Sequence, residues 1–144
     1  MTEVAFHFNV PDRVTYACRL LRKAVGSGVK VVVTGMPDTL QQLDIALWTF
    51  SPTDFVPHCQ FPGEAHMVGA SPVILTSTTE LVPHHQALLN LGHLVPDGVW
   101  EFERVIEIVA LDDLDRQFAR KRWKQYIDDG YAISSHDLVL NGRS

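Results

Sequence analysis

Residues 29–34 have the sequence VKVVVT, a short run of mostly β-branched residues with apolar side chains on both faces. A strand with one buried face alternates between apolar and polar residues, whereas a strand covered on both sides by helices is apolar throughout. This segment therefore predicts an interior strand of a sheet that has helices on both faces.

The segments on either side alternate between strand and helix. Residues 3–10, EVAFHFNV, place apolar side chains at every second position, which predicts a strand. Between this strand and the interior one, apolar residues recur at helical spacing, which predicts a helix that begins after Asp12 and ends at Gly26. Residues 37–50, PDTLQQLDIALWTF, carry a second leucine stripe and predict a helix that ends near Trp48.

The second half of the chain predicts further strands and a final helix. Short strands are expected at residues 55–56, 73–76 and 87–91, followed by a longer strand in RVIEIVAL at residues 104–111. Two aspartates then begin a helix that continues to about Asp128. We expect the tail after about residue 132 to be loosely ordered.

This order of elements predicts an α/β fold of the Rossmann-like type. Right-handed crossovers between strands give a largely parallel, mixed sheet with helices on both faces. The length of 144 residues suits one compact core, so residues 1–144 are expected to form a single domain.

The composition excludes several classes of protein. A net charge of −5 argues against a surface that binds DNA non-specifically, because neutralising phosphates requires a broadly basic face. No apolar run approaches the roughly 20 residues of a membrane span, and the first residues do not resemble an export signal. We therefore expect a cytoplasmic protein without membrane contact, whose Cys18 and Cys59 are reduced and buried.

Familiar nucleotide-binding and catalytic motifs are absent from the sequence. The turn after the first strand is NVPDR at residues 9–13, where a dinucleotide-binding fold would carry a glycine-rich phosphate loop. There is also no P-loop, no G-x-S-x-G nucleophile elbow and no H-E-x-x-H helix. No cofactor is expected.

The histidines of the middle segment raise the question of a metal site. His58, Cys59 and His66 lack the second half of any recognised zinc spacing, and the adjacent His84 and His85 are expected to point apart. Structural or solvated roles are expected for all of them, so no metal is predicted. A small nucleotide- or metal-dependent enzyme that uses this segment is the alternative function.

The final helix carries a basic run at residues 116–125, RQFARKRWKQ, which holds five of the twelve Lys and Arg residues. At 100° per residue, Arg116, Arg120 and Lys124 share one face with Trp123. A solvated helix face is one explanation, since cations in the C-terminal half of a helix complement its dipole. An indole beside guanidinium groups, however, also makes a surface that can take an apolar side chain and an anion together.

The opposite face of this helix is expected to pack on the sheet. It is formed by Leu111, Leu114, Phe118, Ala119 and Tyr126. Arg122 falls in the middle of this apolar face, which we explain by its aliphatic stem lying along apolar surface.

Two stretches together resemble the chi subunit of bacterial DNA polymerase III holoenzyme. They are LDIALWTFSPTDFVPH at residues 43–58 and FERVIEIVALDDLDRQFARKRWKQYIDDGY at residues 102–131, and the layout of the first half is also similar. The resemblance implies a Rossmann-like, non-catalytic subunit of the clamp-loader complex. It further implies two partners, the acidic C-terminal tail of single-stranded-DNA-binding protein and the psi subunit, with mainly indirect contact to DNA.

The resemblance also implies a binding site for that tail. The family's pocket arginine corresponds to Arg120, which would bind the terminal carboxylate through charge-assisted hydrogen bonds. Trp123 corresponds to an aromatic residue on the same helix, and Arg116 and Lys124 correspond to flanking basic positions. One buried aromatic side chain and one charged hydrogen bond together predict an affinity of about micromolar strength.

Three further positions correspond to apolar walls around the terminal Phe of the tail. Trp48 and Phe55 match the L-W and F-V-P-H motifs, and Val109 is an additional candidate. Packing in the protein core is the alternative role for Trp48 and Phe55.

Overall fold

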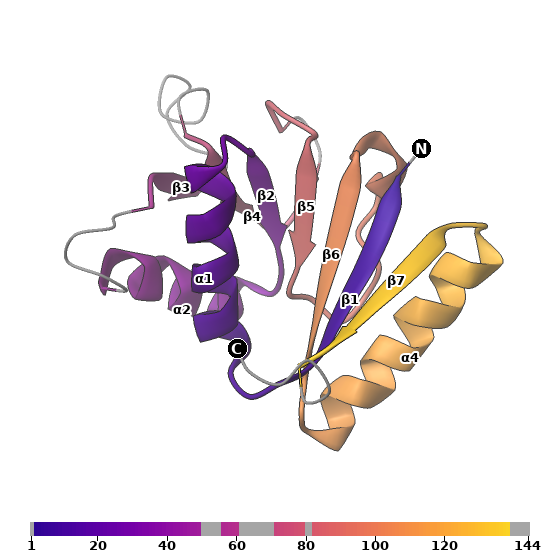
Figure 1. The fold of residues 1–144 in the computed structure, drawn as a ribbon. Coiled ribbons are helices and arrows are strands. Elements are labelled where there is room, and N and C mark those ends of the chain that lie inside the picture. The colour runs from indigo at the N-terminus through magenta and orange to yellow at the C-terminus, as the bar shows by residue number, and fades with distance from the viewer. Residues whose placement is uncertain (1, 50–55, 61–70, 80–81, 139–144) are drawn as a thin grey trace.

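In a computed structural model of the protein, the structure describes residues 2–49, 56–60, 71–79 and 82–138. Helices and strands alternate in the first part of the chain, as the sequence predicted (Figure 1). In order, the elements are β1 (Glu3–Val10), α1 (Arg13–Gly26), β2 (Val31–Thr34), α2 (Pro37–Thr49), β3 (His58–Gln60), β4 (Val73–Thr76), β5 (Ala87–Asn90), a short 3-10 helix η1 (Val99–Glu101), β6 (Arg104–Ala110), α4 (Asp113–Asp128) and β7 (Ala132–Asp137).

The strands form one seven-stranded sheet in the order β3-β4-β2-β5-β6-β1-β7. Every neighbouring pair among these strands is parallel, so the expected mixed sheet is instead entirely parallel. The predicted Rossmann-like α/β fold is confirmed. β2 is an interior strand and all four of its residues are buried, as its apolar sequence predicted.

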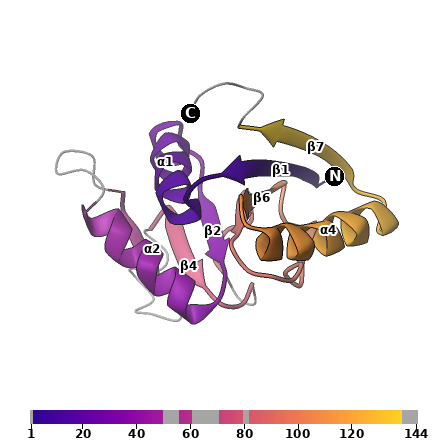
Figure 2. The ribbon, with the colours of Figure 1, turned by 90° about the horizontal axis from the view of Figure 1, so that it is seen from below.

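Helices cover both faces of the sheet, as predicted (Figures 1 and 2). Successive side chains of a strand point to opposite faces, and β2 shows the result. Val31 and Val33 belong to the core under α1 and α2, whereas Val32 belongs to the core under α4. The protein therefore has two apolar cores, one on each face of the sheet.

Side-chain caps fix the beginnings of α1 and α4. Asp12 Oδ1 accepts a hydrogen bond of 3.2 Å from the Thr15 amide, and Asp112 Oδ2 accepts one of 3.1 Å from the Asp115 amide. Each cap satisfies a donor that has no partner within its helix. α4 therefore begins directly after β6, with only two residues between them.

The buried face of α4 differs from the predicted one. Leu111 and Leu114 are 45% and 61% exposed, whereas Ala119 and Tyr126 are buried as predicted. The residues that share the buried face follow helical spacing, and they are Asp115, Ala119, Arg122 and Tyr126. This face of α4 is turned toward the sheet, where the Arg122 side chain pairs with a buried carboxylate of β6.

The segment predicted to be a loosely ordered tail begins with a strand. β7 pairs in parallel with β1, from Glu3 opposite Ala132 to Phe8 opposite Asp137. Its pattern of mostly polar and exposed residues, AISSHD, carries no strand signal of its own, because β7 is the edge strand and buries little. Residues 139–144 lie outside the described residues.

Two further predictions concern the cysteines and the membrane. Cys18 and Cys59 are both buried, as expected. Among the described residues, no helix has the length and apolar character that a membrane span requires.

Candidate functional site

A hollow of about 710 Å³ lies between α4 and the strands at the β7 end of the sheet. Its walls come from four elements that are distant in sequence, namely β1, β6, α4 and β7. The lining residues are Phe6, Phe8, Asn9, Val109, Arg116, Ala119, Arg120, Trp123 and Ser135.

The floor of this hollow, which we call the α4 pocket, is apolar. Phe6, Val109 and Ala119 line it and are buried. The Phe6 ring lies 5.0 Å from the Trp123 ring, measured between centroids, and 5.9 Å from the Tyr126 ring. Trp123 keeps 37% of its surface exposed, so its indole forms a wall that contacts both the core and the solvent.

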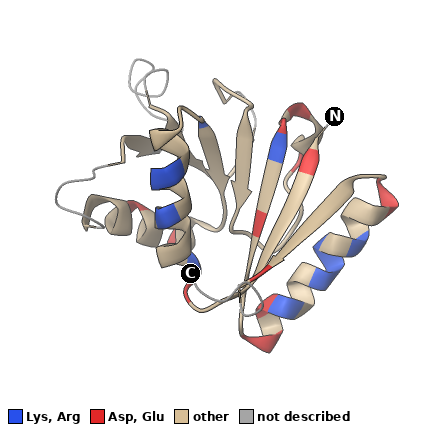
Figure 3. Cartoon of the chain, in the orientation of Figure 1, with Lys and Arg blue, Asp and Glu red and all other residues tan. Residues whose placement is uncertain are grey.

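The rim of the α4 pocket is cationic. The basic residues gather along α4, between acidic residues at its two ends (Figure 3). Arg120 is exposed and makes no ion pair within the described part of the chain. Arg116 donates a hydrogen bond of 2.8 Å from Nη2 to Asn9 Oδ1. An apolar floor with guanidinium groups at its edge suits a ligand that carries both an apolar group and an anion.

Asn9, which accepts the hydrogen bond from Arg116, has an unusual backbone conformation. Its φ angle is 62°, the only positive φ of a non-glycine residue among those described, and it lies where the register between β1 and β6 shifts. Its Nδ2 donates a 2.8 Å hydrogen bond to Asp137 Oδ1 on β7. The side chain thus connects α4 to the edge strand across one end of the pocket.

Two substitutions of Asn9 should separate the strain of its positive φ angle from the contribution of its side chain to stability. Asn9→Gly and Asn9→Ala both remove the amide, but only glycine adopts a positive φ without strain. We expect Asn9→Ala to be less stable than Asn9→Gly by about 1–2 kcal/mol, measured by urea unfolding. Equal stabilities would contradict the left-handed conformation at this position.

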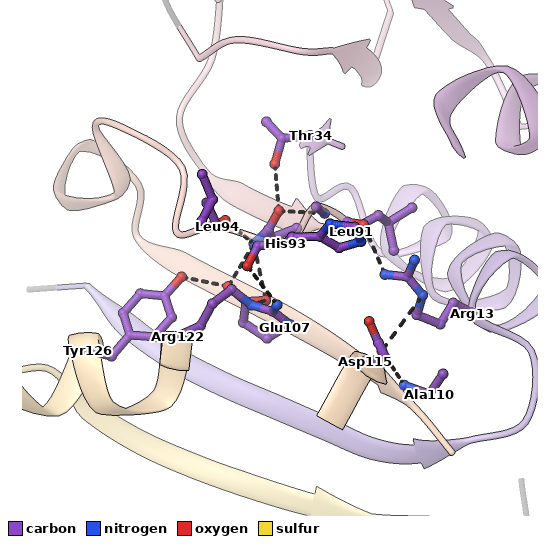
Figure 4. Close-up of polar contacts among 12 residues, drawn as sticks. Arg13, Thr34, Leu91, His93, Leu94, Glu107, Ala110, Asp115, Arg122 and Tyr126 are labelled. Atoms are coloured by element: carbon purple, nitrogen blue, oxygen red, sulfur yellow. Dashed lines mark hydrogen bonds and ion pairs between the residues drawn. The ribbon is translucent and has the colours of Figure 1, made fainter. Parts of the chain in front are cut away.

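A buried polar network holds α4 against the sheet (Figure 4). Arg122 Nε lies 2.9 Å from Glu107 Oε1, and both residues are almost completely buried. Tyr126 donates a 2.7 Å hydrogen bond to Glu107 Oε2, and Asn90 Nδ2 lies 3.0 Å from the same oxygen. Arg122 Nη1 also donates to the His93 carbonyl at 3.2 Å. Charge-assisted hydrogen bonds therefore hold α4, which forms one wall of the pocket, against the sheet.

Burial determines the titration of this network. It raises the pKa of Glu107, because the charged carboxylate loses its hydration, while Arg122 and the hydrogen bonds from Asn90 and Tyr126 oppose the rise. Burial and the adjacent carboxylate also raise the pKa of Tyr126, which remains a donor.

The structure corrects the predicted role of Arg122. The prediction placed its aliphatic stem along apolar surface, whereas its guanidinium is paired in the protein interior.

The structure brings together four of the seven predicted site residues. Arg116, Arg120, Trp123 and Val109 all line the α4 pocket. Lys124 is exposed on α4 directly after Trp123 but does not line the hollow.

The two predicted wall residues from the first half of the chain are not part of this pocket. Trp48 lies on α2, which packs on the other face of the sheet, and is 62% exposed. Its ring centroid lies 5.5 Å from that of His58. Trp48 therefore does not share a hollow with Arg120, in contrast to the sequence-based expectation. Phe55 lies outside the described residues.

Sequence reasoning missed several residues of the pocket. Phe6 and Phe8 were assigned to the apolar face of the first strand, but the sequence did not indicate that α4 packs on that face. Ser135 lies in the segment expected to be a loose tail, and Asn9 gave no signal apart from its position at a strand end.

Two histidines of the middle segment, His58 and His85, have structural contacts. His58 is buried, with Nδ1 at 2.7 Å from the Val56 carbonyl and Nε2 at 2.9 Å from Asp44 Oδ1. The described residues contain no group of three or more side chains that could hold a metal ion. His66 lies outside the described residues.

Comparison with known proteins identifies the family. A family model described as "DNA polymerase III chi subunit, HolC" matches residues 1–134. The chain belongs to the DNA polymerase III chi subunit family. It is thus related to an accessory, non-catalytic subunit of a replicase, as the resemblance implied.

Members of the chi family from three bacteria show how far the similarity extends. The DNA polymerase III subunit chi of Pseudomonas aeruginosa is 32% identical over 144 residues, covering 96% of this chain and 98% of that protein. The Haemophilus influenzae subunit is 29% identical, covering 85% of each chain. The Escherichia coli subunit is 28% identical, covering 82% of this chain and 80% of that protein. The similarity thus includes β1, β6 and α4, three of the four elements that line the α4 pocket.

Proposed function

We propose that this chain binds the acidic C-terminal tail of single-stranded-DNA-binding protein and, through a psi subunit, links it to the clamp loader. Its place of action is then the replication fork in the bacterial cytoplasm, and its contact with DNA is mainly indirect. The observation that supports this proposal most strongly is the α4 pocket, with Arg116 and Arg120 beside an apolar floor and an indole wall.

The chemistry of the pocket matches the end of such a tail. A terminal aromatic side chain would enter the apolar hollow against Phe6 and Trp123, while its carboxylate would accept hydrogen bonds from Arg120. Arg120 is available for this role, since it makes no ion pair within the described residues. Acidic residues preceding the terminus would meet Lys124 and Arg116 on the same helix.

Peptide binding tests this proposal. We expect an acidic peptide that ends in Phe with a free carboxylate to bind with about micromolar affinity, measured by isothermal titration calorimetry. Arg120→Ala should weaken binding by about 10- to 100-fold, because one charged hydrogen bond contributes about 1.5–3 kcal/mol. Amidation of the peptide should cause a similar loss in the wild-type protein.

A double cycle and a matched control make the result specific. If Arg120 binds the terminal carboxylate, amidation should have little further effect in the Arg120→Ala protein. Lys121→Ala removes the same charge from an exposed position of α4 that does not line the pocket, so only a small loss is expected. Equal binding of the free and amidated peptides to the wild-type protein would contradict the proposal.

A further inference from the structure

β7 presents an exposed strand edge beside the α4 pocket. It is the last strand of the sheet, and no strand lies beyond it in the part of the chain that the structure describes. Edge strands are commonly protected by lysine, proline or a covering segment, because their unpaired backbone groups can bind another strand. The sequence of β7, AISSHD, contains neither lysine nor proline.

The register identifies which backbone groups face outward. The Leu138 amide donates a 3.2 Å hydrogen bond to the Phe8 carbonyl, so this amide points toward β1. The N–H and C=O groups of a residue in a parallel strand point to the same side, and this side alternates from one residue to the next. The N–H and C=O groups of Ile133 and Ser135 consequently point away from β1.

The same register turns the Ser135 side chain toward α4. Ser135 is paired with Phe6, and their side chains lie on the same face of the sheet, where both line the α4 pocket. Ser135 therefore presents its small side chain to the α4 pocket and its outward backbone groups to the groove beside it. This groove lies between the edge of β7 and the cationic face of α4.

We infer that the acidic segment preceding the terminal carboxylate binds as an eighth strand along the edge of β7. This inference rests on the function proposed above and adds the conformation of the bound partner. Main-chain hydrogen bonds to Ile133 and Ser135 hold the segment, while every second side chain faces α4. The six residues of β7 span about 20 Å, enough to pair with a short extended peptide.

Charge complementarity selects an acidic segment for this position. Arg120 and Lys124 are both exposed on the helix beside the groove. Side chains of an added strand that point toward α4 would meet these cations, so carboxylates are favoured there and lysine or arginine is disfavoured. The backbone pairing itself is independent of sequence.

A scan of N-methylated peptides tests the inference. The probe is a synthetic acidic peptide that ends in Phe with a free carboxylate, methylated at one backbone amide at a time. Because alternate amides of an added strand point toward β7, we expect affinity to fall by about tenfold or more at every second position and to change little between them. Equal effects at neighbouring positions, or none at all, would overturn the inference. If the unmodified peptide still binds through Arg120 in that case, the proposed function survives.

Substitution of Ser135 provides a test on the protein. Ser135→Pro removes an amide that points away from β1, a position where an edge strand tolerates proline. We expect Ser135→Pro to bind the peptide about tenfold more weakly than Ser135→Ala, because both variants lack the hydroxyl and only the alanine variant keeps the amide. Hydrogen exchange of the Ser135 amide in the wild-type protein decides the question if the proline variant does not fold. Slower exchange with bound peptide supports the inference, and unchanged exchange overturns it.

Discussion

Replacement of Arg122 with alanine is expected to lower the free energy of unfolding by about 3–5 kcal/mol, because it leaves Glu107 charged and unpaired in the interior. Glu107 has no exposed surface, and Arg122 is its only cationic partner in the described network. Urea unfolding followed by circular dichroism measures the loss. Lys121→Ala on the exposed face of α4 is the control and should change the stability by less than about 0.5 kcal/mol.

The loss should depend on pH. A carboxyl group whose pKa is raised in the folded protein keeps its proton to a higher pH than in the unfolded chain. Its contribution to stability is therefore greatest at low pH and is lost as the pH rises through the folded-state pKa. Removal of Arg122 raises the pKa of Glu107 further, so Arg122→Ala should be less destabilising at about pH 5 than at about pH 8, relative to the wild-type protein.

A double substitution tests whether the unpaired charge of Glu107 causes the loss. Arg122→Met with Glu107→Gln removes both charges but keeps a side chain that can accept the hydrogen bond from Tyr126. It should recover most of the stability that Arg122→Ala loses, since replacing a buried ion pair with neutral groups is often close to neutral. A double variant as unstable as Arg122→Ala would show that the ion pair and its hydrogen bonds provide the stability, and that the unpaired charge of Glu107 is not the cause of the loss.

Replacement of Phe6 with alanine is the second large effect, with an expected loss of about 3–5 kcal/mol. Phe6 is 2% exposed and packs against the rings of Trp123 and Tyr126. The substitution removes this packing and deepens the floor of the α4 pocket, so peptide binding should also weaken. Phe6→Leu retains most of the volume and should cost less than about 1.5 kcal/mol.

Phe8→Ala is the matched comparison for the pocket. Phe8 also lines the hollow but is only partly buried, so its removal should cost clearly less stability than that of Phe6. Thermal and urea unfolding, together with calorimetry using the acidic peptide, measure both effects. A Phe6→Ala protein as stable as the wild type would contradict the packing of α4 on β1.

Most elements of this fold follow from local patterns in the sequence. The apolar run of β2, the capping aspartates and the leucine stripe of α2 predicted their elements closely, because burial and capping act on neighbouring residues. The strand predicted at residues 55–56 lies partly outside the described residues, and the structure has a strand at His58–Gln60, where three residues offer little periodicity. β7 was missed because an edge strand needs no apolar pattern.

The candidate site was predictable only in part, because it depends on contacts between distant segments. Spacing along one helix was sufficient to bring Arg116, Arg120 and Trp123 together. The position of Trp48 depends on which face of the sheet α2 covers, and this is set by the order of the strands rather than by local sequence. The sequence did not explain why Arg122 falls on the apolar face of its helix, because its partner, Glu107, lies on another element.

The order of the strands has a consequence for the synthesis of the protein. Among the described strands, β1 comes first along the chain and lies between β6 and β7, the last two. Phe6 and Ser135, on opposite sides of the same hollow, come from near the two ends of the chain. A polypeptide still emerging from the ribosome, or one that ends before β7, cannot assemble this hollow. Only chains that include β7 can therefore form the complete α4 pocket.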